Sequence, residues 1–212
     1  MKRLISGLLL AAAILAAPLT ARAAAPTAFK AKGQVNSLMD GEPQEMSVVI
    51  SFKGGKVRVE TTSKDIGKSI MVGRKGHDEI AMLDPEQKMI VRMKPSALRG
   101  ASNDDAPQFD TLLDPAGFKA LVVKEGKKMG PGEGILGHKT TIYERTKGTT
   151  RMKVWLADDL ELPLRLEGKS KNGDQFKMRI TSLDLSPKFA KDDFDDSPAG
   201  YSEVKAETNE QN

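Results

Sequence analysis

The sequence contains no cysteine, two histidines and one tryptophan, and aromatic residues make up only 5% of it. Without cysteine there is no disulfide framework, so the fold must be held together by its own apolar core. A nucleic-acid-binding protein needs a clustered basic face with aromatic platforms. Aromatic residues are too few here and basic residues are spread along the chain, which excludes that class.

The N-terminus has the features of a secretory signal peptide. Lys2 and Arg3 precede an apolar run over residues 4–19, and Ala21-Arg22-Ala23 supplies the small residues that a signal peptidase reads. The alternative is a transmembrane anchor, but the run is short for a membrane span and Pro18 interrupts it. We therefore predict cleavage after Ala23 and a periplasmic protein, with secretion as the alternative. No cysteine follows the run that could carry a lipid anchor.

The apparent basicity of the chain belongs to this leader. The whole chain has 33 basic and 29 acidic residues, for a net charge of +4. Lys2, Arg3 and Arg22 lie in the leader with no acidic residue, so 30 basic residues remain against 29 acidic ones and the net charge falls to +1.

The sequence predicts three segments: a signal peptide over 1–23, one domain over 24–204 and a disordered polar tail over 205–212. A chain of this size buries roughly 70% of its unfolded surface as a single domain. No Ser-rich or Pro-rich linker divides it. Residues 24–28 are also expected to be disordered.

Short segments with alternating apolar residues dominate the predicted domain, and turn residues separate them. This pattern is typical of antiparallel strands with one buried face. Lys53-Gly54-Gly55 and Asn172-Gly173-Asp174 are strong hairpin signals. From residue 44 to 93 and again from 138 onward, the chain therefore predicts a large one-sided sheet.

The middle of the chain has a different pattern. Apolar residues at helical spacing predict one or two short helices across residues 109–125, interrupted by Pro115 and Gly117. The segment GPGEGILG at 130–137 is not a phosphate-binding loop, because no Lys-Ser/Thr follows in the required place and a strand, not a helix, comes next. It is expected to be a flexible loop.

The sequence predicts about ten strands, each with one apolar face, and few helical residues that could cover those faces. This indicates a mainly β fold of the α+β class. An apolar face must be buried against something, so we expect an open antiparallel half-barrel with short helices covering its concave face. Such a sheet leaves an apolar pocket for a ligand. The predicted ligand-binding residues are Val48, Ile50, Phe52, Val57, Val59, Met82, Met89, Val91, Met93, Met152, Val154, Leu156, Leu164, Leu166, Phe176, Met178 and Ile180.

Five of these predicted inward residues are methionines. Methionine is flexible and polarizable, which suits a surface that fits variable partners such as acyl chains. The equally weighted alternative is that methionine fills irregular gaps in an ordinary core.

Three stretches together carry a family resemblance. The strand ending VWLAD at 154–158 is followed by LPLRL at 162–166; GGKVRVE lies early, at 54–60; and FDDSPAGYSEV ends the domain at 194–204. In this order they resemble the LolA/LolB-like superfamily of periplasmic lipoprotein carriers, and are more similar to its uncharacterised lipoprotein-sorting-like relatives. Trp155 is expected to face away from its strand neighbours and to pack.

The resemblance implies a half-barrel whose cavity shields the acyl chains of a lipid or lipoprotein, with no cofactor. Further candidate partners are an inner- or outer-membrane protein, and the chain is expected to act as a monomer. In the carriers an early-strand arginine holds the closed state, which makes Arg58 a gating candidate. Alternation with Val57 and Val59, however, predicts that Arg58 lies on the outer face.

The residues do not predict an enzyme. Neither His77 nor His138 has a ligand-like partner at a fixed spacing, so no metal site is expected. The aspartates within 192–196 lack the glycine and distal glutamate of an EF-hand loop. No Gly-x-Ser-x-Gly motif occurs. The alternatives to a carrier are an envelope sensor or interaction protein that docks on a membrane-protein partner, and a structural protein whose helices fill the cavity.

Overall fold

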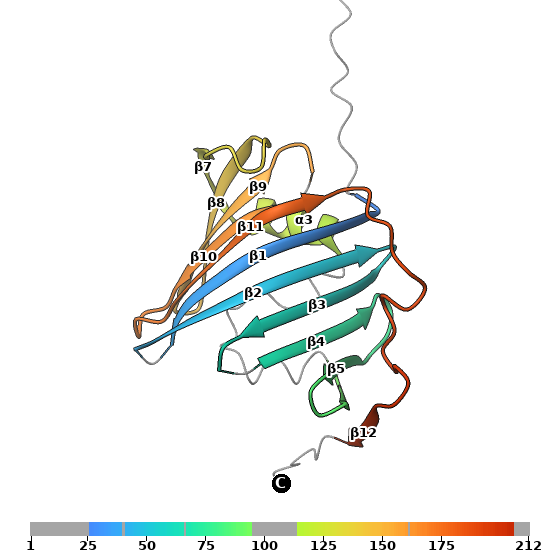
Figure 1. The fold of residues 1–212 in the computed structure, drawn as a ribbon. Helices are drawn as coiled ribbons and strands as arrows, with labels where there is room; N and C mark the ends of the chain where they lie inside the picture. The colour runs from blue at the N-terminus through green and yellow to red at the C-terminus, as the bar shows by residue number, and fades with distance from the viewer. Residues whose placement is uncertain (1–25, 40, 66, 95–113, 161, 206–212) are drawn as a thin grey trace, which may run out of the picture.

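A computed structural model describes residues 26–39, 41–65, 67–94, 114–160 and 162–205. These residues form one curved sheet and one helix, which lies on the inner side of the curve (Figure 1). The strands are β1 (Ala28–Met39), β2 (Glu42–Lys53), β3 (Lys56–Ser63), β4 (Gly67–Arg74), β5 (Ile80–Asp84), β6 (Met89–Met93), β7 (Lys127–Pro131), β8 (Thr140–Lys147), β9 (Thr150–Ala157), β10 (Pro163–Lys169), β11 (Gln175–Asp184) and β12 (Ser202–Lys205), and the helix is α3 (Pro115–Glu125).

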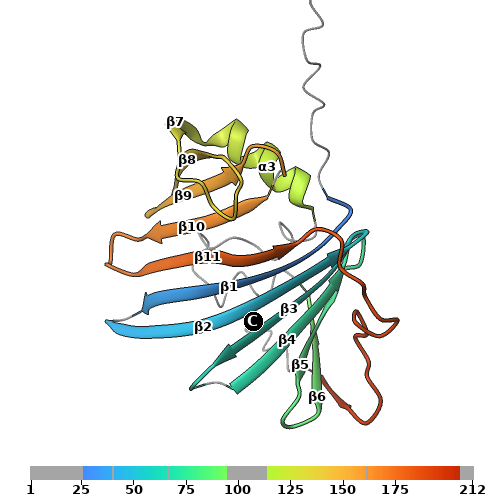
Figure 2. The same cartoon turned by 45° about the horizontal axis from the view of Figure 1, so that its top comes forward.

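The strand order is β12-β6-β5-β4-β3-β2-β1-β11-β10-β9-β8-β7. All neighbours are antiparallel except β12, which runs parallel to β6. The sheet is open, with β12 and β7 at its two edges. Figure 2 shows the succession of strands from β7 to β6. The predicted open half-barrel of mainly β structure is confirmed, with twelve strands where about ten were expected.

The additional strands have weak sequence signals. In β1 the inner positions include Ala31 and Gly33, whose small side chains hide the alternation. We expected Ala28 to lie in a disordered tail, but it begins β1, and its neighbour Thr27 accepts a hydrogen bond from Gly54 N at 2.9 Å. Strand β7 contains Gly130 and Pro131, and β12 is only four residues long.

The predicted hairpin turns are present. Gly54 and Gly55 join β2 to β3 with φ of 54° and 79°, and Gly173 joins β10 to β11 with φ of 101°. These left-handed values are accessible to glycine at little steric cost, so the sequence signal has a direct backbone cause.

Helix α3 confirms the helix expected before residue 125. Asp114 caps it by accepting a hydrogen bond from Gly117 N at 3.3 Å, and Pro115 occupies the first turn, where no N–H partner is needed. Phe118 and Val122, four residues apart, are its buried residues together with Pro115. They share one face and direct it at the sheet. Residues 109–113 of the predicted helical segment lie outside the described residues.

The expectation of a one-sided sheet is wrong at β4–β6. Residues on the outer face of these strands form a buried apolar cluster against which Tyr201 of the C-terminal segment packs. Its members are Ile70, Val72, Ala81, Leu83 and Ile90. The sequence shows continuous apolar runs here, which indicate burial on both faces.

The predicted leader over 1–23 and the tail from residue 206 lie outside the described residues. Lys205, where the tail was expected to begin, is the last residue of β12. Within the described ranges, no helix is long and apolar enough to cross a membrane.

Candidate functional site: the inner face of the sheet

The inner face of the sheet is apolar from β9 to β6. Its strand register places Val59 opposite both Ile50 and Met71, and Met82 opposite both Met71 and Val91. Eleven predicted ligand residues are buried: Val48, Ile50, Phe52, Val57, Val59, Met152, Val154, Leu156, Leu164, Leu166 and Ile180. Six are half-buried: Met82, Met89, Val91, Met93, Phe176 and Met178.

Helix α3 covers one part of this face. Phe118 and Val122 of the helix form a cluster with four buried residues of β9 and β10, namely Met152, Val154, Leu156 and Leu166. Tyr143, Phe176 and Met178 pack around it. The helix therefore occupies the inner face of β8–β11, where the sequence allowed either a ligand cavity or packing by the protein's own helices.

A second apolar group lies on β1–β3. Phe29 and Phe52 stack with ring centroids 5.4 Å apart, and Ile50, Val57 and Val59 are buried in the same cluster. Both groups belong to one continuous inner face, because β1 pairs with β2 on one side and with β11 on the other.

Phe176 lies against the sheet at a glycine. It is paired with Gly168 across β10 and β11, and a Cβ atom at Gly168 would lie 2.0 Å from Phe176 Cε1. Only glycine leaves room for the ring in this position.

A pocket of about 240 Å³ opens between the N-terminus of α3 and the β2–β3 turn. Phe52 and Pro115 are among its apolar lining residues, and Lys75 Nζ lies 3.3 Å from Asp114 Oδ2 at its rim. An apolar interior with one ion pair at the opening suits an amphiphile, whose chain is apolar and whose head group is polar. The sequence did not reveal this pair because 39 positions separate its members.

Polar contacts anchor α3 at both ends. Glu125 near its C-terminus pairs with Arg145 of β8 at 2.5 Å, and Asp114 at its N-terminus pairs with Lys75. Between these contacts the helix is held by Pro115, Phe118 and Val122. The helix is thus attached by three buried side chains and by an ion pair near each end.

The gating candidate Arg58 lies on the outer face. Its Nε donates to Glu60 Oε1 at 3.0 Å, and Lys68 Nζ lies 2.6 Å from the other oxygen of Glu60. Burial opposes ionisation of Glu60, but the hydrogen bonds from Lys68 and Arg58 outweigh it and hold the pKa of this carboxyl below its usual value. This geometry fits the outer-face alternative, and the gating role stays a prediction.

Trp155 also lies on the outer face, opposite Arg165, and is 7% exposed. The Arg165 guanidinium carbon lies 4.5 Å from the centre of its ring. Hydrogen bonds from Arg165 to Glu167, and at 2.6 Å to Glu133, raise the pKa of the arginine. Trp155 thus has a packing role, as expected.

The loop after β7 covers the other side of this tryptophan. A Cβ atom at Gly132 would lie 2.7 Å from Trp155 Cδ1, and the Thr140 hydroxyl donates to Glu133 O at 2.7 Å. Ile135 of the same loop is 2% exposed. The glycine-rich segment is therefore packed against the sheet rather than extended away from it.

The two histidines occupy different surroundings. His77 is exposed in a turn, whereas His138 Nδ1 lies 2.8 Å from Asp159 Oδ2. No group of three or more metal-ligating side chains occurs in the part of the chain that the structure describes. Within the C-terminal acidic run, Asp196 lies 3.5 Å from Arg74 and 3.6 Å from Arg92.

Comparison with solved structures identifies the same architecture elsewhere. An uncharacterized conserved protein from Thermus thermophilus superposes with a TM-score of 0.57 at 12% identity, covering 85% of this chain and 91% of that one. The two chains share a fold. No protein-family model and no curated protein sequence matches the chain.

Other structures that match the chain include a LolA superfamily protein and MucB. A LolA superfamily protein from Nitrosomonas europaea matches at 10% identity with a TM-score of 0.39, covering 77% of this chain and 88% of that one. MucB in the MucA/MucB complex from Pseudomonas aeruginosa matches at 15% identity with a TM-score of 0.43. That match covers 78% of this chain and 54% of MucB, so the chain spans about half of that neighbour.

Proposed function

We propose that this chain is a periplasmic binding or carrier protein, and not an enzyme, that holds an acyl chain of a lipid or lipoprotein against the inner face of its sheet. The observation that carries the proposal is the continuous apolar inner face, covered on β8–β11 by helix α3. Each buried CH₂ of a ligand contributes about 0.8 kcal/mol, so a partly buried acyl chain binds usefully.

In this proposal α3 acts as a displaceable plug. The bound chain takes the place of Phe118 and Val122 on the strands, while the helix moves from its position between Lys75 and Arg145. Replacing one apolar contact by another keeps the sheet covered in both states. The pocket beside Phe52 is the entry point, and its rim ion pair faces the polar head group.

The test is native mass spectrometry of the exported chain, purified without detergent and incubated with phosphatidylglycerol or a triacylated lipopeptide. A photoactivatable acyl chain then locates the contact. We expect a bound-lipid mass and crosslinks to inner-face residues such as Phe176 and Met178. An unliganded mass under all conditions would contradict the proposal.

Two substitutions on β11 give a matched comparison. Met178→Asp places a charge on the inner face and is expected to abolish uptake, whereas Gln175→Asp on the outer face leaves it unchanged. Circular dichroism confirms that both variants are folded. Arg58→Leu tests the gating prediction, which unchanged lipid release would contradict.

The second candidate function is an interaction protein of the cell envelope. It is favoured by the open edge of the sheet at β7, where an added strand of a membrane-protein partner could pair. The two functions separate in one experiment, since an interaction protein yields a crosslinked protein partner and no co-purifying lipid.

A further inference from the structure

The outer face of β1 and β8–β11 is strongly basic. It carries eight basic side chains, Lys30, Lys32, Arg151, Lys153, Arg165, Lys169, Lys177 and Arg179, against three carboxylates, Glu144, Glu167 and Asp184. The net charge of these strand side chains is therefore +5, or +4 when Glu133 of the loop after β7, which pairs with Arg165, is included, whereas the whole predicted mature chain has +1. The positive charge of the protein is concentrated on one face.

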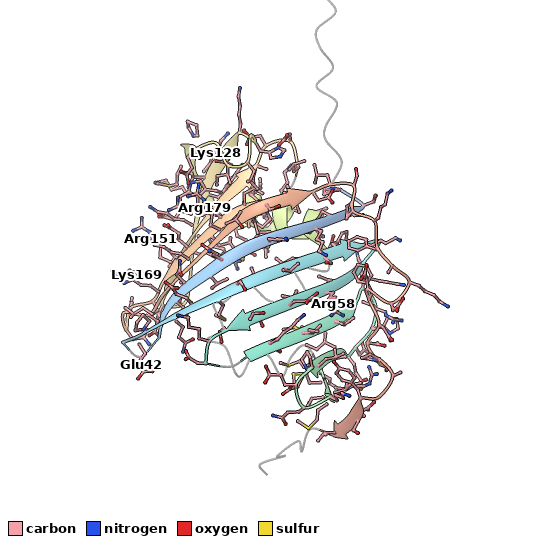
Figure 3. All side chains as sticks on the ribbon, in the orientation of Figure 1. Glu42, Arg58, Lys128, Arg151, Lys169 and Arg179 are labelled. Carbon is pink, nitrogen blue, oxygen red and sulfur yellow. The ribbon has the colours of Figure 1, made fainter. Side chains whose placement is uncertain are left out.

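Six of these basic residues are exposed and define what we call the basic face: Lys30, Lys32, Arg151, Lys169, Lys177 and Arg179. Arg151, Lys169 and Arg179 are labelled in Figure 3 on the side of the sheet away from α3. They come from β1, β9, β10 and β11, which are neighbours in the sheet about 4.8 Å apart. The charges therefore form an array rather than a single point.

The carboxylates of this surface neutralise only part of the array. Glu144 pairs with Arg151 at 2.6 Å, and Glu167 is shared by Arg165 and, at 4.0 Å, Lys177. Among the described residues no ion pair engages the remaining members of the basic face, which are Lys30, Lys32, Lys169 and Arg179.

Two cross-strand pairs place like charges opposite each other. Arg179 faces Arg165 across β11 and β10, and Lys169 faces Arg151 across β10 and β9. Like charges in directly opposed positions destabilise a sheet. Glu167 and Glu133 pair with Arg165, and Glu144 pairs with Arg151, so one member of each opposed pair is compensated within the fold. The other members, Arg179 and Lys169, remain available to an anionic partner.

From this geometry we infer that the basic face docks on the surface of an anionic phospholipid bilayer. A specific protein interface needs an apolar or aromatic centre. The exposed large hydrophobic residues in the described ranges are Val123, Met129, Leu136, Leu185 and Val204, and all of them lie outside β1 and β9–β11, the strands that form the basic face. An extended cationic surface without such a centre fits lipid head groups, which are spread laterally and carry negative charge.

The inference is independent of the proposed acyl-chain site, because it uses the opposite side of the sheet. Docking there leaves α3 and the inner face directed away from the bilayer plane. Attraction of this kind is worth about a fivefold change in partition for each basic residue near an anionic surface, and it weakens as salt shortens the Debye length.

The test is flotation of the exported chain with vesicles of phosphatidylglycerol and phosphatidylethanolamine, compared with vesicles of phosphatidylcholine. We expect binding to the anionic vesicles alone and release at about 1 M NaCl, where the Debye length is about 3 Å. The triple variant Lys32→Glu, Lys169→Glu and Arg179→Glu should bind at least roughly 100-fold more weakly, because the fivefold factor applies to each of the three lost cations and the three new carboxylates add repulsion. Because none of the three makes a described ion pair, the variant should keep its melting temperature.

The matched control changes the net charge equally at exposed positions away from the basic face. Lys64→Glu, Lys88→Glu and Lys94→Glu lie in the turns and strand ends of β3–β6. This variant should bind anionic vesicles nearly as well as the unaltered chain. An equal loss in both triple variants would overturn the inference in favour of a general charge effect.

Met178→Asp separates this inference from acyl-chain binding. It alters the inner face only, so it should lose lipid uptake and keep vesicle binding. If it loses vesicle binding while folded, adhesion comes from acyl capture and the basic face is not the docking surface. Failure of the unaltered chain to bind anionic vesicles also overturns the inference, and directs attention to an acidic protein.

Discussion

The two halves of the outer face treat their charged side chains in different ways. On β4–β6 the chain covers its own surface: Tyr201 packs on the apolar cluster, and Arg92 is held by Glu203 at 3.1 Å and by Ser197 Oγ at 2.6 Å. Burial disfavours the charged form of Arg92, but its hydrogen bond to Glu203 and the charge of Asp196 raise its pKa above the usual value.

On β9–β11 and β1, by contrast, no other part of the described chain covers the six exposed residues of the basic face. Arg179 stands opposite Arg165 and is exposed. The continuous apolar runs of β4–β6 thus go with an outer face that the chain covers itself, whereas the alternating strands β9–β11 and β1 leave exposed cations on theirs. Charge that a fold does not use for its own stability is available for binding.

Removal of the C-terminal segment that covers β4–β6 should have the largest effect on the stability of the protein. Ending the chain after Leu185 exposes Ile70, Val72, Leu83 and Ile90, each worth about 1.5–3 kcal/mol when buried. We expect aggregation and loss of cooperative thermal unfolding, measured by light scattering and circular dichroism. A chain ending at Lys205 is the control, and equal behaviour of the two would show that the segment does not support the sheet.

The two arginines Arg92 and Arg179 offer a direct comparison of the halves. Arg92→Ala removes a hydrogen bond to the Glu203 carboxylate and another to the Ser197 hydroxyl, and should lower the free energy of unfolding by about 2 kcal/mol. Arg179→Ala removes an exposed side chain without an ion pair and should change it by less than about 0.5 kcal/mol. Urea denaturation measures both values. Similar losses would mean that Arg179 also stabilises the fold.

In the basic half of the outer face, we expect Arg165 to contribute more to the stability of the fold than the exposed Arg151. Arg165→Lys loses the planar contact with Trp155 and one of its two glutamate contacts, at a cost of about 1 kcal/mol. Arg151→Lys keeps the charge beside Glu144 at an exposed position and should cost less than about 0.5 kcal/mol. Denaturation curves that rank the two variants in the opposite order would contradict the packing role of this arginine.

The smallest effect concerns pH. Because the pKa of Glu60 is lowered in the folded state, this residue stabilises the fold above its unfolded pKa of about 4.5, and the contribution disappears as pH falls through the lower folded value. Glu60→Gln should therefore flatten the decline of stability below about pH 4.5. Melting temperatures from pH 7 to pH 3 measure the difference. An unchanged acid profile would exclude a role for the contacts with Arg58 and Lys68.

Much of the inner face was predictable from local pattern. Alternation along β2 and β9 identified Val48, Ile50, Met152 and Val154 as inward residues, because successive side chains of a strand point to opposite faces. The outer position of Arg58 follows from the same rule. The pocket at Lys75 and Asp114 and the plug made by α3 were not predictable, since they join segments that are distant in sequence.

The sequence by itself determined which residues alternate, where the hairpins turn and that helix formation precedes residue 125, because each of these depends on neighbours a few positions away. Only the tertiary structure decided that β1 lies between β2 and β11, which places Lys30 opposite Asp184 and sets Lys32 two positions along β1 from Gln34, the partner of Arg179. It also decided that β12 pairs with β6 and that the apolar runs of β4–β6 are buried on both faces. The physical reason is that any strand edge offers the same backbone donors and acceptors, so strand order is selected by packing of the whole chain.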